Sequence, residues 1–327
     1  MSIREEYTFL SSDERKTNLH AVKWIPSDNK IDEVLLIHHG MEEFILKYDE
    51  FANFLADNHI AVMGYDQIGH GESVENKDDL GVMHTNSPAE IMVKDMLSHY
   101  KIAQDNFKGK PIFMLGHSMG SYLLRMFLSF YSSNLKDLKG AILIGTGTES
   151  DKGLEVAEHI LKKLASIRGW NYKSKIIHMF MFERAIRYYD VTGKNPAHNW
   201  MTKNIKKVEE YYECPLTNFM FSLNGYKLLL DAIYYDNQQE NIEKIRKDLP
   251  VIFLSGKDDV VGNMGKGVEE AADKFRAANI KDVFMKLYTN DRHEILSEPD
   301  RKVVYNDILS WIKDLSLIHI SEPTRLL

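Results

Sequence analysis

One serine of this sequence stands between two glycines in a setting suited to nucleophilic catalysis. The stretch GHSMG, residues 116–120, places Ser118 after the apolar run PIFML and before the amphipathic stretch MGSYLLRMF. A strand that turns tightly into a helix leaves no room for side chains two positions either side of the serine, and Gly116 and Gly120 meet that demand. The turn would lift the hydroxyl above the carboxyl ends of the strands, where the first helical amides favour a developing negative charge. We therefore predict that Ser118 is a nucleophile.

A serine hydroxyl needs a base and an orienting carboxylate, and the sequence offers both after late apolar runs. For a strand–turn–helix nucleophile the expected chain order is serine, acid, histidine. VIFLSGKDDVVG supplies Asp258 and Asp259, and FMKLYTNDRHEIL supplies His293. Asp259 is the preferred acid, because in this architecture the acid usually stands third after a glycine, here Gly256, and Asp258 is the alternative. We predict that His293 is the general base.

The oxyanion formed on attack needs two hydrogen-bond donors. The backbone amide of Met119, at the head of the nucleophile helix, supplies one. The stretch IHHGMEEF, residues 37–44, offers the other, because Gly40 allows a sharp turn that would aim the amide of Met41 into the site. We interpret the two histidines of this stretch as structural. The same holds for DQIGHGES, whose Asp, His and Ser suit a turn stabilised by side-chain bonds to the backbone.

The elements that must position these residues alternate between strands and helices. Short apolar runs, typical of strands buried on both faces, occur at 34–37, 60–65, 111–115, 141–144, 250–256 and 282–288. The first 25 residues predict a β-hairpin, and helical patterns separate most of the other runs. We therefore predict an α/β fold with a mainly parallel eight-stranded sheet, helices on both of its faces and an antiparallel edge formed by the first hairpin.

The alternation stops at residues 149–245, where the chain becomes helical and rich in Tyr and Met. We predict a helical lid there, inserted between a first part of the core, 1–148, and a second part, 246–314. Its Met and aromatic side chains suit core packing and acyl chains, and an outward apolar face would allow transient contact with a lipid surface. Residues 315–327 are interpreted as a read-through tail, since LSLIHISEPTR resembles a translated transposon end from sequencing libraries.

Composition and charge exclude several classes of function. The 327 residues carry 41 Lys and Arg against 48 Asp and Glu, a net charge of −7, so nucleic acid is not expected as a partner. The single cysteine, Cys214, excludes an internal disulfide and a cysteine-cluster metal site. No phosphate loop, dinucleotide motif or metal-ligand spacing occurs, so we expect neither metal nor cofactor. Without a leader or a membrane span in the sequence, we expect a cytoplasmic protein.

Five motifs together resemble the monoacylglycerol lipase and lysophospholipase group of serine α/β-hydrolases. They are HHGMEEF, DQIGHGES, GHSMG, SGKDDVVG and RHEIL, in that order between about residues 31 and 311. The resemblance implies the α/β-hydrolase fold. It also implies a triad of Ser118, Asp259 and His293, with the amides of Met41 and Met119 as the oxyanion hole.

Two parts of the chain bear on the substrate. Lid stretches that contain Trp200 and Phe219 are similar to lid segments of the same group whose aromatic residues line the acyl pocket. Together with Gly40, these are the candidate substrate-binding residues. The group usually carries a glycine-containing stretch and a histidine after the first-strand glycine, whereas MEEF, residues 41–44, follows here. Two acidic side chains near the mouth of the site would disfavour an anionic head group.

These inferences predict a serine hydrolase that cleaves lipid-type carboxylic esters, foremost monoacylglycerol, through an acyl-enzyme on Ser118. The alternatives on the same triad are a lysophospholipase, a general carboxylesterase, a thioesterase and an aminopeptidase-like hydrolase. A hydrolase fold kept for ligand binding without catalysis is the remaining alternative.

Overall fold

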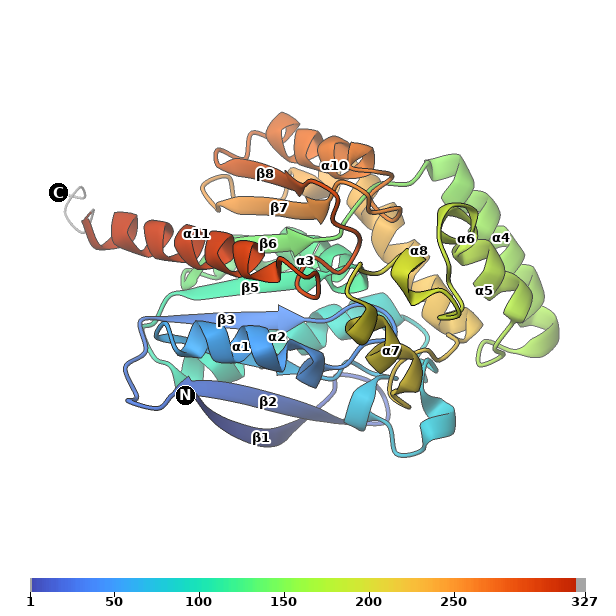
Figure 1. Ribbon diagram of the computed structural model, residues 1–327, viewed down its shortest axis with the longest axis horizontal. Helices are drawn as coiled ribbons and strands as arrows, with labels where there is room; N and C mark the ends of the chain where they lie inside the picture. Colours follow the sequence, from blue (N-terminus) through green and yellow to red (C-terminus); the bar gives the residue numbers. More distant parts are fainter. Residues whose placement is uncertain (1, 322–327) are drawn as a thin grey trace.

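The centre of the computed structural model, which describes residues 2–321, is an eight-stranded sheet (Figure 1). Its strands are β1 (Ser2–Leu10), β2 (Asn18–Pro26), β3 (Glu33–His38), β4 (Ile60–Tyr65), β5 (Ile112–His117), β6 (Leu138–Ile144), β7 (Val251–Gly256) and β8 (Val283–Tyr288). They lie in the order β1-β2-β4-β3-β5-β6-β7-β8. The pairs β1–β2 and β2–β4 are antiparallel, and all other neighbours are parallel. The predicted sheet with its antiparallel hairpin edge is confirmed.

The strands follow the apolar runs because helices shield both faces of the sheet. Every residue of β3, β4, β5 and β7 is buried, as expected for strands at the centre of a parallel sheet. The edge strand β1 is largely exposed and carries Arg4, Glu5 and Glu6. Charged side chains on an edge strand discourage pairing with another sheet.

Helices form a layer on each face of the sheet. One face is covered by α1 (Asp49–Ala56) and α11 (Arg301–Ser321), the other by α2 (Pro88–Asn106), α3 (Met119–Tyr131) and α10 (Lys266–Ala277) (Figure 1). Each layer packs its own apolar core against the sheet. The helix α2 starts after Ser87 with a proline in its first turn, as the sequence indicates, although the Ser87 hydroxyl makes no cap hydrogen bond. None of the helices within residues 2–321 combines the length and apolar character needed to cross a membrane.

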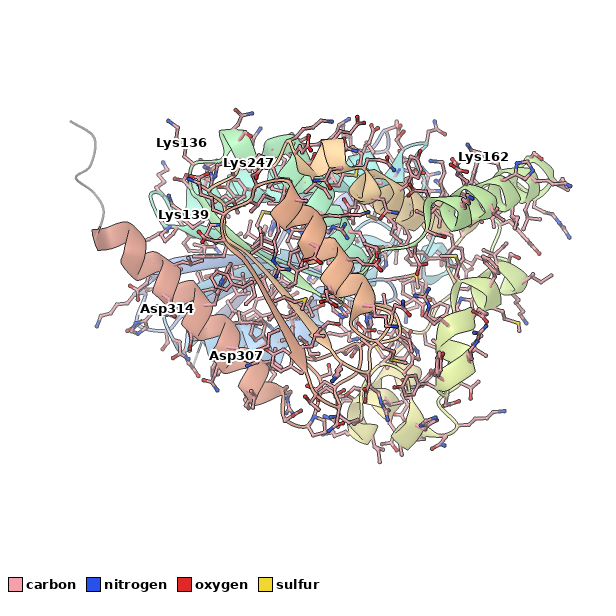
Figure 2. All side chains as sticks on the ribbon, turned by 90° about the horizontal axis from the view of Figure 1, so that it is seen from above. Lys136, Lys139, Lys162, Lys247, Asp307 and Asp314 are labelled. Atoms are coloured by element: carbon pink, nitrogen blue, oxygen red, sulfur yellow. The ribbon has the colours of Figure 1, made fainter. Side chains whose placement is uncertain are left out.

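The chain between β6 and β7 consists mainly of helices, and we call residues 149–245 the cap segment. Its helices are α4 (Asp151–Arg168), α5 (Lys175–Met181), α6 (Glu183–Tyr188), α7 (Ile205–Glu213), α8 (Leu223–Asn237) and α9 (Gln239–Ile242). Helices α4, α5, α6 and α7 lie at the end of the sheet toward which the parallel strands point (Figure 1). Figure 2 shows the opposite end, where Lys139 of β6 and Lys247 before β7 lie far from Lys162 of α4. The role of the cap segment as a lid stays a prediction.

A buried arginine joins the nucleophile helix to the cap segment. The guanidinium of Arg125, on α3, donates hydrogen bonds to the carbonyls of Gly147 at 2.9 Å and of Asp236 at 3.2 Å. It also lies 3.3 Å from the Asp236 carboxylate on α8. A buried guanidinium is tolerated only when its N–H groups find acceptors, so these contacts hold α8 and the loop after β6 against α3.

Helix α11 continues beyond Asp314, where we expected the native sequence to end. It runs to Ser321, and the hydroxyl of Ser316 donates a hydrogen bond to the carbonyl of Ile312 at 3.0 Å. The interpretation of residues 315–327 as a read-through tail stays a prediction, and residues 322–327 lie outside the described residues.

Gly140 of β6 permits the close contact between the sheet and α11. A Cβ atom at Gly140 would lie 2.6 Å from the Trp311 ring and 3.0 Å from the Phe113 ring. We expect Gly140→Ala to lower the free energy of unfolding by about 1–3 kcal/mol, because an overpacked core must shift a helix or distort rotamers. Urea unfolding of the purified variant measures the loss.

Gly153→Ala in α4 is the matched control, since a Cβ there would meet only the Ser150 hydroxyl, at 2.9 Å. Alanine favours the helix, so we expect no loss of stability in this control. In Gly140→Ala/Trp311→Phe the smaller ring should recover part of the loss. Equal unfolding free energies for Gly140→Ala and the wild type would contradict this account.

Candidate active site

Ser118 lies at the sharp turn between β5 and α3. Its backbone has φ 50° and ψ −120°, a conformation that residues with a Cβ adopt only at a cost. A Cβ at Gly116 would lie 2.3 Å from the carbonyl oxygen of Gly120, and one at Gly120 would lie 2.2 Å from that of His38. Both glycines are therefore required by the close approach of β5, α3 and β3, which explains the spacing of the GHSMG motif.

Asp259 and His293 meet between the loops that follow β7 and β8. Nδ1 of His293 lies 3.0 Å from each carboxylate oxygen of Asp259. The Asp259 carboxylate also accepts hydrogen bonds from the Val261 amide at 2.8 Å and the Ser255 hydroxyl at 3.1 Å. Burial raises the pKa of Asp259, but attraction to His293 and these hydrogen bonds outweigh burial and hold it below its usual value. The pair can therefore keep the Nδ1 proton of His293 in place.

Asp258, the alternative acid, is held differently. Its amide donates to the carbonyl of Asp291 at 2.9 Å, and its carbonyl accepts from the Tyr189 hydroxyl at 3.1 Å. Within residues 2–321, no hydrogen bond or ion pair joins the Asp258 carboxylate to His293. Of the two candidates, Asp259 is the one that reaches the imidazole.

Two cavities of different character meet at Ser118. The larger, of about 360 Å³, is lined largely by apolar side chains of the cap segment and α3, among them Met119, Tyr122, Leu154, Leu230 and Ile233. The smaller, of about 30 Å³, is lined by polar groups that include those of His293, Glu42 and Tyr211. Met41, Ser118, Phe182 and Trp200 line both. The serine therefore stands between a largely apolar space and a small one whose lining mixes polar and apolar side chains.

The predicted oxyanion amides belong to residues beside Ser118. Met41 lines both cavities and Met119 lines the larger one. Among the described residues, no group accepts a hydrogen bond from the Met41 amide, and the first amides of a helix have no acceptor within it. A Cβ at Gly40 would lie 3.0 Å from that of Ser118, so a glycine lets this loop approach the serine. Both amides are thus available to a ligand atom.

The imidazole of His293 lies between two aromatic rings. The Trp200 indole stacks on it, with ring centroids 5.2 Å apart and planes at 27°, and the His117 ring centroid lies at 4.9 Å. Since Nδ1 faces Asp259, Nε2 is the nitrogen available for proton transfer. Ser118 and His293 line the same small cavity, although no hydrogen bond joins them in the described part of the chain. Such catalytic hydrogen bonds are often long before a substrate binds.

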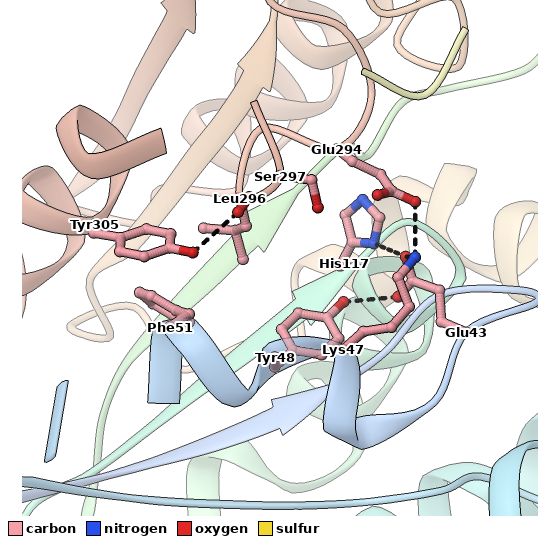
Figure 3. A pocket seen from close by; sticks show the side chains of 9 residues that line it. All are labelled: Glu43, Lys47, Tyr48, Phe51, His117, Glu294, Leu296, Ser297 and Tyr305. Atoms are coloured by element: carbon pink, nitrogen blue, oxygen red, sulfur yellow. Dashed lines mark hydrogen bonds and ion pairs between the residues drawn. The ribbon is translucent and has the colours of Figure 1, made fainter. Parts of the chain in front are cut away.

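A buried charged cluster behind Ser118 was not identified from the sequence (Figure 3). The Glu43 carboxylate lies 3.0 Å from His117 Nδ1 and 3.5 Å from Lys47 Nζ, and it accepts a hydrogen bond from the Tyr48 hydroxyl at 2.7 Å. Lys47 in turn lies 2.9 Å from the Glu294 carboxylate. With His117 protonated, the cluster holds two positive and two negative side chains, which compensates for their burial.

Mutual attraction sets the protonation states in this cluster. Burial raises the pKa of Glu43, but His117, Lys47 and the Gly40 amide outweigh it and hold the pKa well below its usual value. Burial lowers the pKa of His117, but the attraction of Glu43 outweighs burial and raises it. Sequence adjacency is the signal that could have revealed the cluster: His117 precedes Ser118, and Glu294 follows His293.

The two acidic residues expected near the mouth of the site, Glu42 and Glu43, both line the small cavity, but they are not open to solvent. Glu42 and Glu43 are each only 4% exposed. Glu43 belongs to the charged cluster, and Oε2 of Glu42 accepts a hydrogen bond from the Tyr211 hydroxyl at 2.5 Å. Burial raises the pKa of Glu42 to about 7, because it outweighs the hydrogen bond from Tyr211 and the charge of Lys47, which both lower the pKa. Hydrogen-bond partners contributed by distant segments draw both carboxyl groups inward.

The other predicted residues are divided between the site and the core. Trp200 lines both cavities, whereas Phe219 lines neither and packs with ring centroids 6.0 Å from Phe221 and 5.5 Å from His70.

The structural interpretation of DQIGHGES is confirmed. Asp66 accepts hydrogen bonds from backbone amides at 2.6 and 2.9 Å, and the Ser73 hydroxyl donates to the Asp66 carbonyl at 2.6 Å.

Loss of the Glu43 carboxylate should destabilise the fold. Glu43→Leu leaves the His117 imidazolium, the Tyr48 hydroxyl and the Gly40 amide without their buried partner, so we expect the free energy of unfolding to fall by about 3–5 kcal/mol. Denaturant unfolding measures the change. Glu5→Leu, which removes an exposed partner of Lys23, is the control and should cost less than about 1 kcal/mol. Equal effects of the two substitutions would contradict a structural role for the cluster.

Glu42 should give the fold a pH dependence of definite sign. Its pKa is about 7 in the folded protein against an ordinary value of 4.5, so the folded state binds more protons between these pH values. The associated stability is full below pH 4.5 and is lost as the pH rises through 7. Glu42→Gln removes this titration. As the pH rises from about 5 to about 8, we therefore expect the unfolding free energy of the variant to increase by roughly 2–3 kcal/mol relative to that of the wild type. Unfolding at both pH values, with Glu213→Gln as control, measures this, and a constant difference would contradict it.

Comparison with known proteins agrees with this architecture. The family described as serine aminopeptidase, S33, matches residues 29–300. Monoglyceride lipase of Mus musculus is 34% identical over 97 residues, which cover 30% of this chain and 30% of that relative's length. Monoglyceride lipase of Saccharomyces cerevisiae is 26% identical over 306 residues, which cover 88% of this chain and 87% of that relative.

Solved structures share the fold over nearly the whole chain. A highly thermostable carboxyl esterase from Bacillus coagulans has a TM-score of 0.86 at 22% identity, covering 97% of this chain and 100% of the esterase. The predicted α/β-hydrolase fold and the resemblance read from the five motifs are confirmed. Because the family described as serine aminopeptidase, S33, matches residues 29–300, which is most of the chain, this chain belongs to that family of α/β-hydrolases.

Proposed function

We propose that this protein is a serine hydrolase that cleaves lipid-type carboxylic esters, foremost monoacylglycerols, through an acyl-enzyme on Ser118. The observation that carries the proposal is the position of Ser118 between a large, mostly apolar cavity and a small one with several charged and polar groups, beside the His293–Asp259 pair. The family match and two relatives named monoglyceride lipase support a lipid ester as substrate.

The proposed reaction has two steps. Nε2 of His293 takes the proton of the Ser118 hydroxyl while Oγ attacks the ester carbonyl, and the amides of Met41 and Met119 donate hydrogen bonds to the oxyanion. The tetrahedral intermediate then expels the alcohol, which receives the proton from His293. In the second step His293 takes a proton from water while its oxygen attacks the acyl carbon. The bond to Oγ then breaks, His293 returns the proton to Oγ of Ser118, and the fatty acid leaves.

The larger cavity suits the acyl chain. Its lining is mostly apolar, and its two carboxylates have cationic partners: Glu149 lies 2.9 Å from Arg184, and Glu183 pairs with Arg187. Neither carboxylate is therefore set aside for the ammonium group of a peptide, which favours a lipid ester over an aminopeptidase substrate. Each buried methylene of an acyl chain contributes about 0.8 kcal/mol, so binding should strengthen until the cavity is full.

Exposed apolar side chains of the cap segment support its proposed roles as a lid and as a contact with lipid surfaces. Ile167 is 72% exposed, Ile176 80% and Met179 61%, although large apolar side chains are usually buried. Phe180, which is 55% exposed, also lines the larger cavity. An apolar path from a lipid surface to Ser118 would let a monoacylglycerol enter without passing through water.

The test is fatty acid release from monoacylglycerols of increasing chain length. We expect kcat/KM to rise a few-fold per added methylene and then to level off or fall, because the larger cavity has a finite length. Ser118→Ala should reduce turnover by several orders of magnitude, since it removes the nucleophile. Ser118 should also react with a fluorophosphonate probe.

Ser166→Ala is the control, because Ser166 lies exposed on α4 and donates only to the carbonyl of Lys163. It should retain full activity and labelling. Full activity of Ser118→Ala would overturn the assignment of the nucleophile. Negligible rates on every monoacylglycerol, with a small aryl ester still cleaved through Ser118, would move the substrate to another class of ester.

A further inference from the structure

The small cavity beside Ser118 has a carboxyl group in its wall that the proposed mechanism does not use. Glu42 lines this cavity together with Ser118, His293 and Tyr211. Its Oε2 accepts a hydrogen bond from the Tyr211 hydroxyl, whereas its Oε1 is buried and has no hydrogen-bond partner among the described residues. Buried carboxylate oxygens without a partner are rare because they lose their bonds to water.

The backbone at Glu42 is also unusual. Its φ is +58°, in the left-handed region that favours glycine, so a glutamate at this position costs conformational free energy. Among the described residues, the Tyr211 hydroxyl on α7 is the group that donates a hydrogen bond to its carboxyl group. Strained residues that carry an unsatisfied polar group are a feature of ligand sites.

The place of Glu42 relative to Ser118 identifies the part of the substrate that it faces. The acyl chain fits the larger apolar cavity, so the alcohol of the ester must lie on the other side of the carbonyl carbon. That side holds His293, which gives its proton to the departing alcohol. A volume of about 30 Å³ has room for a group of the size of a water molecule, such as a hydroxyl.

We propose that Glu42, oriented by Tyr211, binds a free hydroxyl group of the leaving alcohol and thereby selects esters of polyols over esters of simple alcohols. The substrate hydroxyl donates a hydrogen bond to Oε1 and so satisfies the carboxyl oxygen that has no partner in the protein. The same carboxyl group disfavours phosphate-bearing alcohols, through charge repulsion and through the small volume. This inference rests on the proposed ester hydrolysis at Ser118 and names the determinant of its alcohol specificity.

The test compares two esters of one fatty acid, the 1-monoacylglycerol and the propyl ester, whose alcohols have the same carbon skeleton and differ in two hydroxyl groups. At about pH 8, above the pKa of about 7 of Glu42, we expect the wild type to prefer the monoacylglycerol in kcat/KM by roughly 10- to 100-fold, the range for a hydrogen bond to a charged group. Glu42→Gly removes the carboxyl group and suits the left-handed backbone, so kcat/KM should fall far more on the monoacylglycerol than on the propyl ester and the preference should vanish.

Two further variants separate binding from structure. Glu42→Gln keeps an acceptor oxygen and should retain most of the preference, and Tyr211→Phe, which removes the orienting hydrogen bond, should lose part of it. Glu213→Gln, at the exposed end of the same helix α7, is the control and should keep both rates.

Each outcome distinguishes this inference from the proposed function. An unchanged preference in Glu42→Gly, or no preference in the wild type, overturns the role of Glu42 but leaves hydrolysis at Ser118 intact. Equal losses on both esters in Glu42→Gly also overturn it, because they indicate a structural role. Hydrolysis of neither ester by the wild type overturns the proposed function itself.

Discussion

The carboxylate of Glu43 is the interaction on which the arrangement of the site depends. It holds the amide of Gly40 in the loop after β3, lies beside His117 at the end of β5, and connects through Lys47 to Glu294 in the loop after β8. Buried charges keep their partners because each would otherwise lose its hydration without compensation. The three loops that carry the predicted oxyanion amide, nucleophile and base therefore form one unit, and a shift of one would break contacts of the others.

The second constraint is steric and belongs to the strands. Backbone atoms approach so closely around Ser118 that Gly116 and Gly120 cannot carry a Cβ. The same holds at Gly256, where a Cβ would lie 2.1 Å from the carbonyl oxygen of Asp291. Gly116 and Gly120 let β5, α3 and β3 approach one another, and Gly256 brings the end of β7 near the loop after β8. The charged cluster fixes the loops relative to one another, and the glycines fix how near to the sheet they stand.

Much of the fold follows from local patterns in the sequence, whereas the cluster and the inner carboxyl groups do not. The strands could be predicted because each is a short apolar run between turn residues, and the position of Ser118 because its neighbours are glycines. His117, Glu43, Lys47 and Glu294 come from three distant segments, and the signal in the sequence is limited to the adjacency of His117 and Glu294 to the predicted nucleophile and base. The burial of Glu42 depends on Tyr211, which lies 169 residues further along the chain. Phe219 packs against the rings of His70 and Phe221 and lines neither cavity, and one of these partners, His70, lies far away in the sequence.

The stacking of Trp200 on His293 places a fluorophore against the proposed base. The two rings lie nearly parallel, at 27°, with centroids 5.2 Å apart. Imidazolium is an electron acceptor that quenches indole emission, whereas neutral imidazole quenches it weakly. The intensity of Trp200 emission should thus follow the proton on His293, and tryptophans elsewhere in the chain supply a constant background. Trp200 emission would therefore report the transfer of a proton to His293 during turnover, and rapid-mixing instruments can record it.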